Sequence, residues 1–199
     1  MTTNGSSSGS RPKGRRRKEI DLVAVAEGAA RLFSEGGYEA VSIEAVAEKM
    51  SMSRATLYRT VRTKEQLLGI LFERSTQGLD RAANALVDEN REPKDELLAW
   101  LSLHIAAAIE TRGYMAVFLA SPASSPEALA RWQKFTRSYE KLWVDVIARA
   151  MDAGVLLPGD PALTTRLLLG MVIWVSRWYR PGEKYTADHI AEAAIRWRR

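Results

Sequence analysis

The feature that most constrains the fold is the spacing of apolar residues, which recur every three or four positions from residue 22 towards the C-terminus. This spacing places them on one face of an α-helix, whereas a half-buried strand alternates apolar and polar residues. The sequence contains no alternating run, no internal repeat and no long linker. Its 199 residues, 46 % of them hydrophobic, are enough to bury a core. We therefore expect an all-α fold.

Glycine, proline and capping residues divide this pattern into about nine helices. Gly36 and Gly37 stop the first, Gly113 is expected to break a long apolar run, and Gly154 closes a later helix. Asp160 followed by Pro161 is a strong start signal for a helix that is apolar almost all round, and therefore buried on more than one side. The expected helices span residues 22–35, 43–50, 54–61, 64–89, 93–112, 114–119, 126–153, 161–180 and 187–199.

The positive charge of the chain is confined to its first 18 residues. These carry six basic residues and no acidic one, whereas the rest of the chain holds 23 basic and 24 acidic residues. A short basic block at a terminus is typically disordered and often contacts a polyanion. The alternative is a solubilising tail, and the Ser-rich stretch at 6–10 has the composition of a linker.

The composition excludes several chemistries. The chain has no cysteine and only two histidines, His104 and His189. Disulfides, thiolate metal sites and a cysteine nucleophile are therefore impossible, and we expect no metal, no cofactor and no catalytic residues. The absence of a charge-free apolar run of about 18 residues argues against a membrane span, and no secretory signal is present. We expect a cytoplasmic protein.

Residues 42–61 have the pattern of a helix-turn-helix. Two short helices are joined by a turn at 51–53, and Val46 and Ala47 are small enough to let them cross closely. Met52 and Leu57 fill the shared core, which leaves the polar side chains of the second helix facing outward for a DNA major groove. The alternative is an ordinary helical hairpin in a bundle.

The same region resembles the TetR/AcrR family of transcriptional regulators. The resemblance rests on Ser-Arg-Ala-Thr-Leu-Tyr-Arg at 53–59 and Thr-Lys-Glu-Gln-Leu-Leu at 63–68. Upstream elements at 29–33, 36–38 and 43–47 match in order and spacing. Val61 departs from the family pattern, which usually has an aromatic residue there. The resemblance implies a basic arm at 1–18, a DNA-binding domain at 19–79, and an effector-binding and dimerisation domain at 80–199.

The resemblance also implies how DNA is bound. A homodimer formed through its last two long helices would place two reading heads on a palindromic operator in double-stranded DNA. Arg15, Arg16 and Arg17 of the arm would reach an adjacent minor groove. By analogy, the expected phosphate contacts are Ser42, Ser53, Tyr58 and Lys64. The residues expected to face bases are Arg54, Ala55, Thr56 and Arg59.

Large aromatic residues suggest a ligand cavity in the C-terminal part. All six tryptophans lie outside the DNA-binding region, and a core of large rings tends to enclose space, although plain core filling is the alternative for each one. His104 shares a helix face with apolar residues, either as a ligand anchor or as a satisfied core histidine. The expected effector-binding residues are Trp100, His104, Phe118, Trp132, Phe135, Tyr139, Met171, Trp174, Arg177 and Trp178.

The end of the helix at 161–180 bears on the class of effector. Residues 174–182 look similar to the corresponding segment of TetR-type regulators of actinobacterial lipid and steroid breakdown, several of which respond to acyl-coenzyme A. Arg177 and Arg180 would then bind the phosphates of the ligand, or else they cap the carbonyls at the helix end. Gly170 either permits close helix approach or faces a bulky neighbour within one subunit.

Together these features predict a ligand-responsive DNA-binding regulator, most simply a repressor that a small apolar or acyl-coenzyme A effector releases from its operator. A regulator without a small-molecule effector is the alternative among binding proteins. A helical enzyme is disfavoured, because the sequence offers no phosphate loop, metal spacing or nucleophile arrangement.

Overall fold

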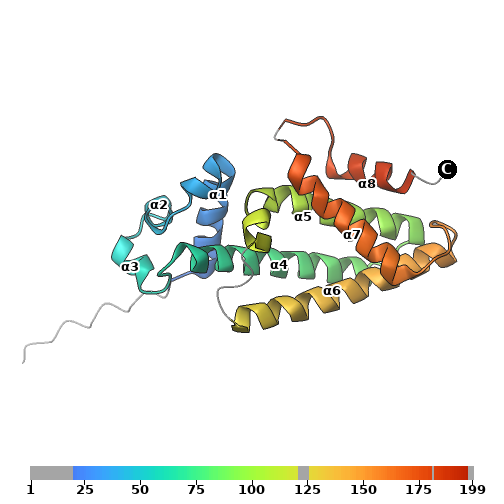
Figure 1. Ribbon diagram of the computed structural model, residues 1–199, viewed down its shortest axis with the longest axis horizontal. Helices are drawn as coiled ribbons and strands as arrows, with labels where there is room; N and C mark the ends of the chain where they lie inside the picture. Colours follow the sequence, from blue (N-terminus) through green and yellow to red (C-terminus); the bar gives the residue numbers. More distant parts are fainter. Residues whose placement is uncertain (1–19, 121–125, 181, 197–199) are drawn as a thin grey trace, which may run out of the picture.

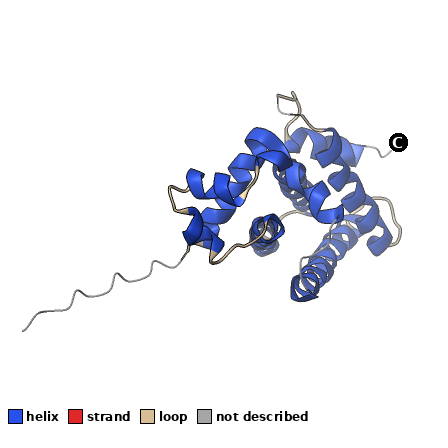
Figure 2. Ribbon diagram, turned by 60° about the vertical axis from the view of Figure 1, so that its left-hand side comes forward, coloured by secondary structure: helices blue, strands red, loops and turns tan. Residues whose placement is uncertain are grey.

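The computed structural model describes the backbone of residues 20–120, 126–180 and 182–196, and the side chains of 20–112, 130–180 and 182–196. Within these ranges the chain forms eight α-helices and no strand, which confirms the expected all-α fold (Figure 2). Arg15, Arg16 and Arg17 of the basic arm and the side chain of Phe118 lie outside the described residues.

The helices form a small head and a larger body, with α4 running between them (Figure 1). The head contains the first three helices, and the body contains the last four. Their bounds are α1 (Leu22–Ala40), α2 (Ile43–Lys49), α3 (Arg54–Tyr58), α4 (Lys64–Asp88), α5 (Pro93–Ala120), α6 (Pro126–Asp152), α7 (Pro161–Trp178) and α8 (Ala187–Arg196).

Capping side chains fix where the helices of the head begin. The hydroxyl of Ser42 accepts a hydrogen bond from the amide of Ala45 at 3.0 Å, and Ser53 caps α3 in the same way. Thr63 accepts from the amide of Gln66, whose side-chain oxygen reaches back to the amide of Arg62 at 2.8 Å. These contacts satisfy backbone donors that a helix start leaves unpaired.

Two of the expected helices are one. The helix expected to break at Gly113 instead continues as α5 from Pro93 to Ala120, so the described residues hold eight helices rather than about nine. A single glycine costs a helix interior only about 1 kcal/mol, which is too little to end a long helix. Gly37, by contrast, adopts φ 69°, a left-handed conformation that suits glycine, and kinks the end of α1.

Two hydrophobic cores share α4. The head core is built around Val25, Phe33 and Leu57, and it includes Leu67 and Leu71 from the first turns of α4. The body core surrounds Trp100 and Trp143, and it includes Ala83 from the later turns of the same helix. Val61, the departure from the family pattern, is fully buried in the head core. Helix α4 is therefore the packing link between the body and the head.

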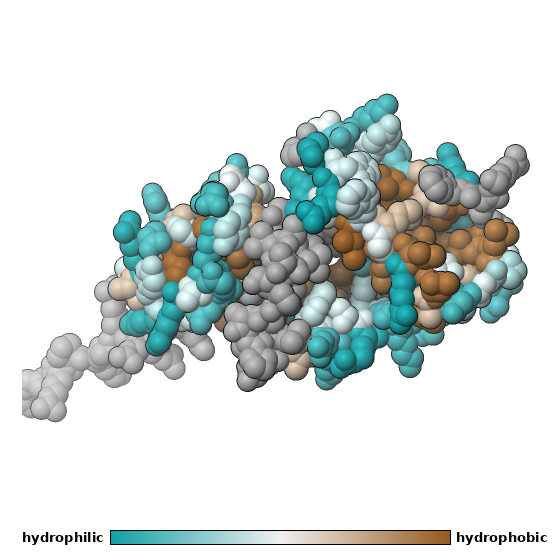
Figure 3. Space-filling view, viewed as in Figure 1, coloured by the Kyte–Doolittle hydropathy of each residue, from teal (hydrophilic) through white to brown (hydrophobic). Residues whose placement is uncertain are grey.

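Two features stand out in the described part of the body: an ion pair with a buried carboxylate, and an exposed apolar face. Arg149 of α6 donates two hydrogen bonds, at 2.9 and 2.6 Å, to the buried carboxylate of Glu96 at the start of α5. This bidentate geometry fixes the two helices in register. Elsewhere the outward side of α7 leaves large apolar side chains in solvent, and apolar surface gathers where α7 crosses the body (Figure 3).

None of the described helices combines the length and the apolar character needed to cross a bilayer.

Candidate functional site

The second helix of the helix-turn-helix, α3, presents its polar side chains to solvent. Arg54, Ala55 and Arg59 are exposed, and Leu57 points inward and is fully buried. The hydroxyl of Thr56 is hydrogen-bonded to that of Ser53 at 2.7 Å, which holds the methyl group of Thr56 in a fixed orientation. The surface formed by residues 53–59 thus brings together the base-facing side chains that the sequence predicts.

Tyr58 is held at the edge of this surface by α2. Its hydroxyl donates a 2.7 Å hydrogen bond to a carboxylate oxygen of Glu44. This bond lowers the pKa of Glu44, and the same bond is the main reason that the pKa of Tyr58 is raised. Sequence reasoning did not include Glu44, which lies in the first turn of α2 and reaches α3. Tyr58 is therefore oriented before any partner arrives.

Lys64, a predicted phosphate contact, is engaged within the head. Its ammonium donates to the backbone carbonyl of Tyr38 at 2.5 Å and lies 3.5 Å from the centre of that ring. A cation over an aromatic face is attracted by the negative electron density of the ring. A phosphate at this position would share the lysine with Tyr38, whereas Ser42 offers its hydroxyl from the start of α2.

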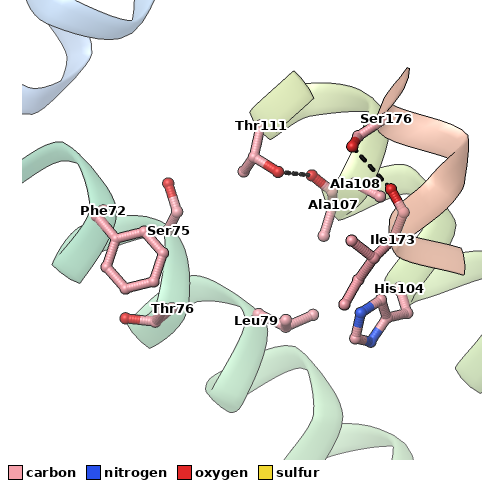
Figure 4. Close-up of a pocket in the computed structure, with 10 residues that line it drawn as sticks. All are labelled: Phe72, Ser75, Thr76, Leu79, His104, Ala107, Ala108, Thr111, Ile173 and Ser176. Carbon is pink, nitrogen blue, oxygen red and sulfur yellow. Dashed lines mark hydrogen bonds between the residues drawn. The ribbon is translucent and has the colours of Figure 1, made fainter. Parts of the chain in front are cut away.

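A cavity opens in the body between α4, α5 and α7 (Figure 4). All the space up to the open solvent amounts to about 440 Å³, but the volume open to the centre of a water-sized molecule is only about 60 Å³. The cavity can therefore take a small apolar group or one end of a larger ligand. The lining side chains come from three helices and carry no charge. They are Phe72, Ser75, Thr76 and Leu79 of α4, His104, Ala107, Ala108 and Thr111 of α5, and Ile173 and Ser176 of α7.

An aromatic row connects the two sides of this cavity. Phe72 packs edge to face on Trp132 at 4.9 Å, and Trp132 continues through Phe135 to Tyr139 at ring distances of 5.6 and 5.3 Å. Tyr139 then contacts His104 through a 3.1 Å hydrogen bond to Nδ1. Both ends of the row, Phe72 and His104, line the cavity.

The predicted effector residues fall into three groups. His104 lines the cavity, and Tyr139, Trp132 and Phe135 lie behind it in the aromatic row. Trp100 is fully buried beside Trp143, with ring centres 5.4 Å apart. The remaining described members lie on the exposed outer side or at the end of α7 and are not among the cavity-lining residues. They are Met171, Trp174, Arg177 and Trp178.

Nine of the ten lining residues were not predicted. Their sequence signal is a shared spacing, because residues 72, 75, 76 and 79 repeat the i, i+3, i+4, i+7 pattern of residues 104, 107, 108 and 111. Within each stripe the middle positions are small: Ser75 and Thr76 in α4, and Ala107 and Ala108 in α5. Two facing stripes with small centres leave space between their helices.

The end of α7 satisfies its own carbonyls. The Arg180 guanidinium donates to the backbone oxygens of Arg177 and Tyr179 at 3.0 and 3.3 Å. This is the helix-capping role expected of a basic residue at a helix C-terminus. Among the described side chains, no group of His, Asp and Glu is arranged to hold a metal ion.

Comparisons with known proteins agree with this architecture. Residues 25–69 match the family model of bacterial regulatory proteins of the tetR family, and residues 90–197 match that of the tetracyclin repressor-like C-terminal domain. The chain is 29 % identical over 196 residues to the HTH-type transcriptional repressor KstR2 of Mycolicibacterium smegmatis, covering 92 % of this chain and 88 % of that protein.

Solved structures show the same fold. PfmR, a TetR family transcriptional regulator from Thermus thermophilus, is 29 % identical with a TM-score of 0.72, covering 86 % of this chain and 94 % of that chain. AibR, solved with isovaleryl coenzyme A and operator DNA, is 24 % identical with a TM-score of 0.68, covering 87 % and 95 %. With family models matching both its head and its body, this chain belongs to the TetR family of transcriptional regulators.

Proposed function

We propose that the protein is a ligand-responsive repressor in the cytoplasm. It binds a palindromic operator as a homodimer and is released when an effector occupies the cavity between α4, α5 and α7. One observation carries this proposal: α4 lines the cavity and also belongs to both cores. It supplies four lining residues, including Phe72 and Leu79, and these lie between the residues that α4 gives to the head core and Ala83, which it gives to the body core.

The exposed surface of α3 suits the major groove. Arg54 and Arg59 carry forked donors that pair with guanine, while Ala55 and the methyl group of Thr56 suit the methyl group of thymine. Donors for phosphates lie at the two ends of this helix and on the neighbouring helices. They are Ser53 and Tyr58 of α3, Ser42 at the start of α2 and Lys64 at the start of α4, and phosphate contacts set the position of the head on the duplex.

The exposed face of α7 supports dimerisation through the last two long helices, α6 and α7. Leu167 and Trp174 are 66 % and 64 % exposed and lie two turns apart on one side of α7. Gly170 lies between them, and a Cβ at that position would meet nothing within 4 Å. The bulky neighbour considered for Gly170 is therefore absent within the described subunit, and a second copy of α7 can approach closely there.

Release follows from linkage between the two sites. A dimer binds a palindrome when its heads are spaced about one helical turn apart, roughly 34 Å. An effector that fits the cavity better in another spacing weakens operator binding by the same factor by which the operator weakens effector binding. Since α4 contacts both the cavity and the head core, a ligand in the cavity changes the position of the head by moving α4.

The cavity favours a small apolar effector over a whole acyl-coenzyme A molecule. None of the described lining residues is a cation, and Arg180 is engaged with carbonyls at the end of α7. An acyl thioester would place only its acyl part in the cavity and leave its phosphates outside. The presence of the cavity also favours an effector-responsive regulator over one that responds to no small molecule.

The test of this function is binding to the DNA that flanks the protein's own gene. We expect a gel shift with one palindromic fragment, competed by the unlabelled fragment and not by its scrambled sequence. Small apolar ketones and acyl-coenzyme A thioesters are then added to the complex. Absence of sequence-specific binding to any flanking fragment contradicts the proposal, and a complex that no compound dissociates contradicts the effector-responsive part of it.

The basic arm is expected to add phosphate or minor-groove contacts. Deleting residues 1–17 should weaken operator binding and flatten the plot of log K against log salt concentration by about 0.9 for each lost phosphate contact. The measurement is a set of anisotropy titrations at four salt concentrations, with both proteins on the same operator. An unchanged slope would identify the arm as a solvated tail.

A further inference from the structure

The described residues that line the cavity carry no charge, and their hydroxyl protons are already used in hydrogen bonds. Thr111 donates to the carbonyl of Ala107 at 2.7 Å, and Ser176 donates to that of Ile173 at 2.7 Å (Figure 4). The hydroxyls of Ser75 and Thr76 likewise donate to carbonyls of α4. A ligand carboxylate or phosphate would therefore find no compensating cation in the described lining, and burying an unpaired charge is strongly unfavourable.

His104 is the one described lining residue whose side chain contains nitrogen atoms. Its ring extends from α5 towards Leu79 of α4 (Figure 4). Nδ1 is paired with the hydroxyl of Tyr139 at 3.1 Å, and none of the hydrogen bonds among the described residues involves Nε2. Burial lowers the pKa of His104 to about 4, so the ring is uncharged at neutral pH.

The tautomer of His104 follows from Tyr139. The hydroxyl of Tyr139 is buried, and Nδ1 of His104 is the acceptor that the described structure gives it. A buried O–H without an acceptor is costly, whereas an oxygen lone pair without a donor is tolerated more often. Tyr139 therefore donates to Nδ1, and the proton of the neutral imidazole lies on Nε2. His104 thus presents an N–H donor in the wall of the cavity.

The surrounding core has more donors than acceptors. Trp143 lies 5.8 Å from His104 between ring centres, and Trp100 lies 5.4 Å from Trp143. Both indole N–H groups are buried. Among the described residues that of Trp100 has no hydrogen-bond partner, and that of Trp143 has only the hydroxyl of Tyr139 beside it. An incoming molecule that brings an acceptor complements this region, and a molecule that brings only donors does not.

We propose that the effector places in the cavity an uncharged apolar group with a carbonyl oxygen that accepts a hydrogen bond from Nε2 of His104. This inference rests on the proposed function and names the ligand class of its cavity. A ketone and the carbonyl of a thioester or ester share this chemistry. The two sources differ in size, because coenzyme A has to remain outside the cavity whereas a simple ketone is enclosed.

The test uses matched probes and the full chain without DNA. The first probe is 4-butylcyclohexanone, and the second is 1-butyl-4-methylenecyclohexane, which replaces the carbonyl oxygen with a methylene group of similar shape. A third, 4-butylcyclohexanecarboxylate, adds a negative charge. Binding is followed by tryptophan fluorescence, since Trp143 lies beside His104. The quantity compared between variants is the ratio of ketone to alkene affinity, which cancels their different solubilities in water.

We expect His104→Phe to lower this ratio about tenfold, the effect of losing one hydrogen bond to the ligand. The double variant His104→Phe/Tyr139→Phe removes both sides of the internal hydrogen bond, and it should show the same loss if the single variant folds poorly. His189→Phe changes the only other histidine, which caps α8 away from the cavity, and should leave the ratio unchanged. The carboxylate should bind more weakly than the ketone.

Three results overturn the inference: a ratio that His104→Phe and the double variant leave unchanged, a carboxylate that binds as tightly as the ketone, and a failure of both neutral probes to bind.

These outcomes are separate from the failure of the proposed function. A protein that binds the ketone but no operator refutes the regulator. A protein released from its operator by a carboxylate that has no ketone, ester or thioester group refutes only this ligand class. Comparing acetyl-coenzyme A and octanoyl-coenzyme A with 2-octanone distinguishes the thioester source from the ketone source.

Discussion

Replacing Tyr58 with alanine is expected to weaken operator binding by at least about thirtyfold while leaving the fold and the dimer intact. Losing one such contact costs about 1–3 kcal/mol per half-site, and a dimer loses it twice. The side chain is 41 % exposed and contributes little to the head core, so the loss should appear in DNA affinity rather than in stability. Thr56→Ala, in the middle of the same surface, should act in the same direction.

The measurement is an anisotropy titration of labelled operator at one fixed salt concentration. Tyr185→Ala is the matched control, because Tyr185 is a tyrosine of similar exposure, 44 %, in the body. Tyr58→Phe separates the ring from its hydroxyl and from the hydrogen bond to Glu44. Unchanged affinity in a folded, dimeric Tyr58→Ala protein would show that α3 does not contact the operator.

The second large effect is expected at the outer face of α7. The double substitution Leu167→Glu/Trp174→Glu should convert the dimer to a monomer and abolish operator binding at concentrations that saturate the wild type. Four carboxylates would be buried in a symmetric interface, and an unpaired buried charge costs several kcal/mol. A total of about 4 kcal/mol already raises the dimer dissociation constant roughly a thousandfold.

Sedimentation equilibrium over a hundredfold range of protein concentration checks this result. Leu157→Glu is the control, because Leu157 is 67 % exposed but lies in the loop between α6 and α7 rather than on the outer face of α7. Circular dichroism confirms that the helices remain. Persistence of the dimer in the double variant, with wild-type affinity between subunits, would place the interface on another surface.

The head was predictable because its signals are local. The capping residues Ser42, Ser53 and Thr63 each bind the amide three residues further along the chain, so their roles can be recognised in a short stretch of sequence. Leu57 and Val61 are buried where the helical period puts them. The contact between Tyr58 and Glu44 was missed because it joins two helices, although both residues lie within the same motif.

The cavity was not predictable to the same degree. Its walls depend on how α4, α5 and α7 pack, and a stripe of apolar residues predicts burial without stating against what. The apolar helix at 161–180 was expected to be buried on more than one side. In the single chain Leu167 and Trp174 are instead exposed, because sequence hydrophobicity does not distinguish a core from a face for another subunit.

The merged helix α5 has a similar cause. The expected break at Gly113 was a local inference from one residue, and the preference of one glycine is too small to end a helix of this length. His104 illustrates the opposite case, since the sequence left open a ligand anchor or a satisfied core histidine. It is hydrogen-bonded to Tyr139 and also lines the cavity, so neither alternative excludes the other.

The sharing of α4 limits how this protein can be recombined with others. A head fragment cut before Lys64 would lose Leu67 and Leu71 and with them one wall of its core. A cut near Gly78 would keep that core but divide the cavity wall, which continues to Leu79. A chimeric regulator that joins this body to a foreign head must therefore carry the junction upstream of Phe72 and repack Leu67 and Leu71 against the new head. The head and the body can therefore not be exchanged independently of each other, and sequence changes in one of them limit the changes that the other can accept.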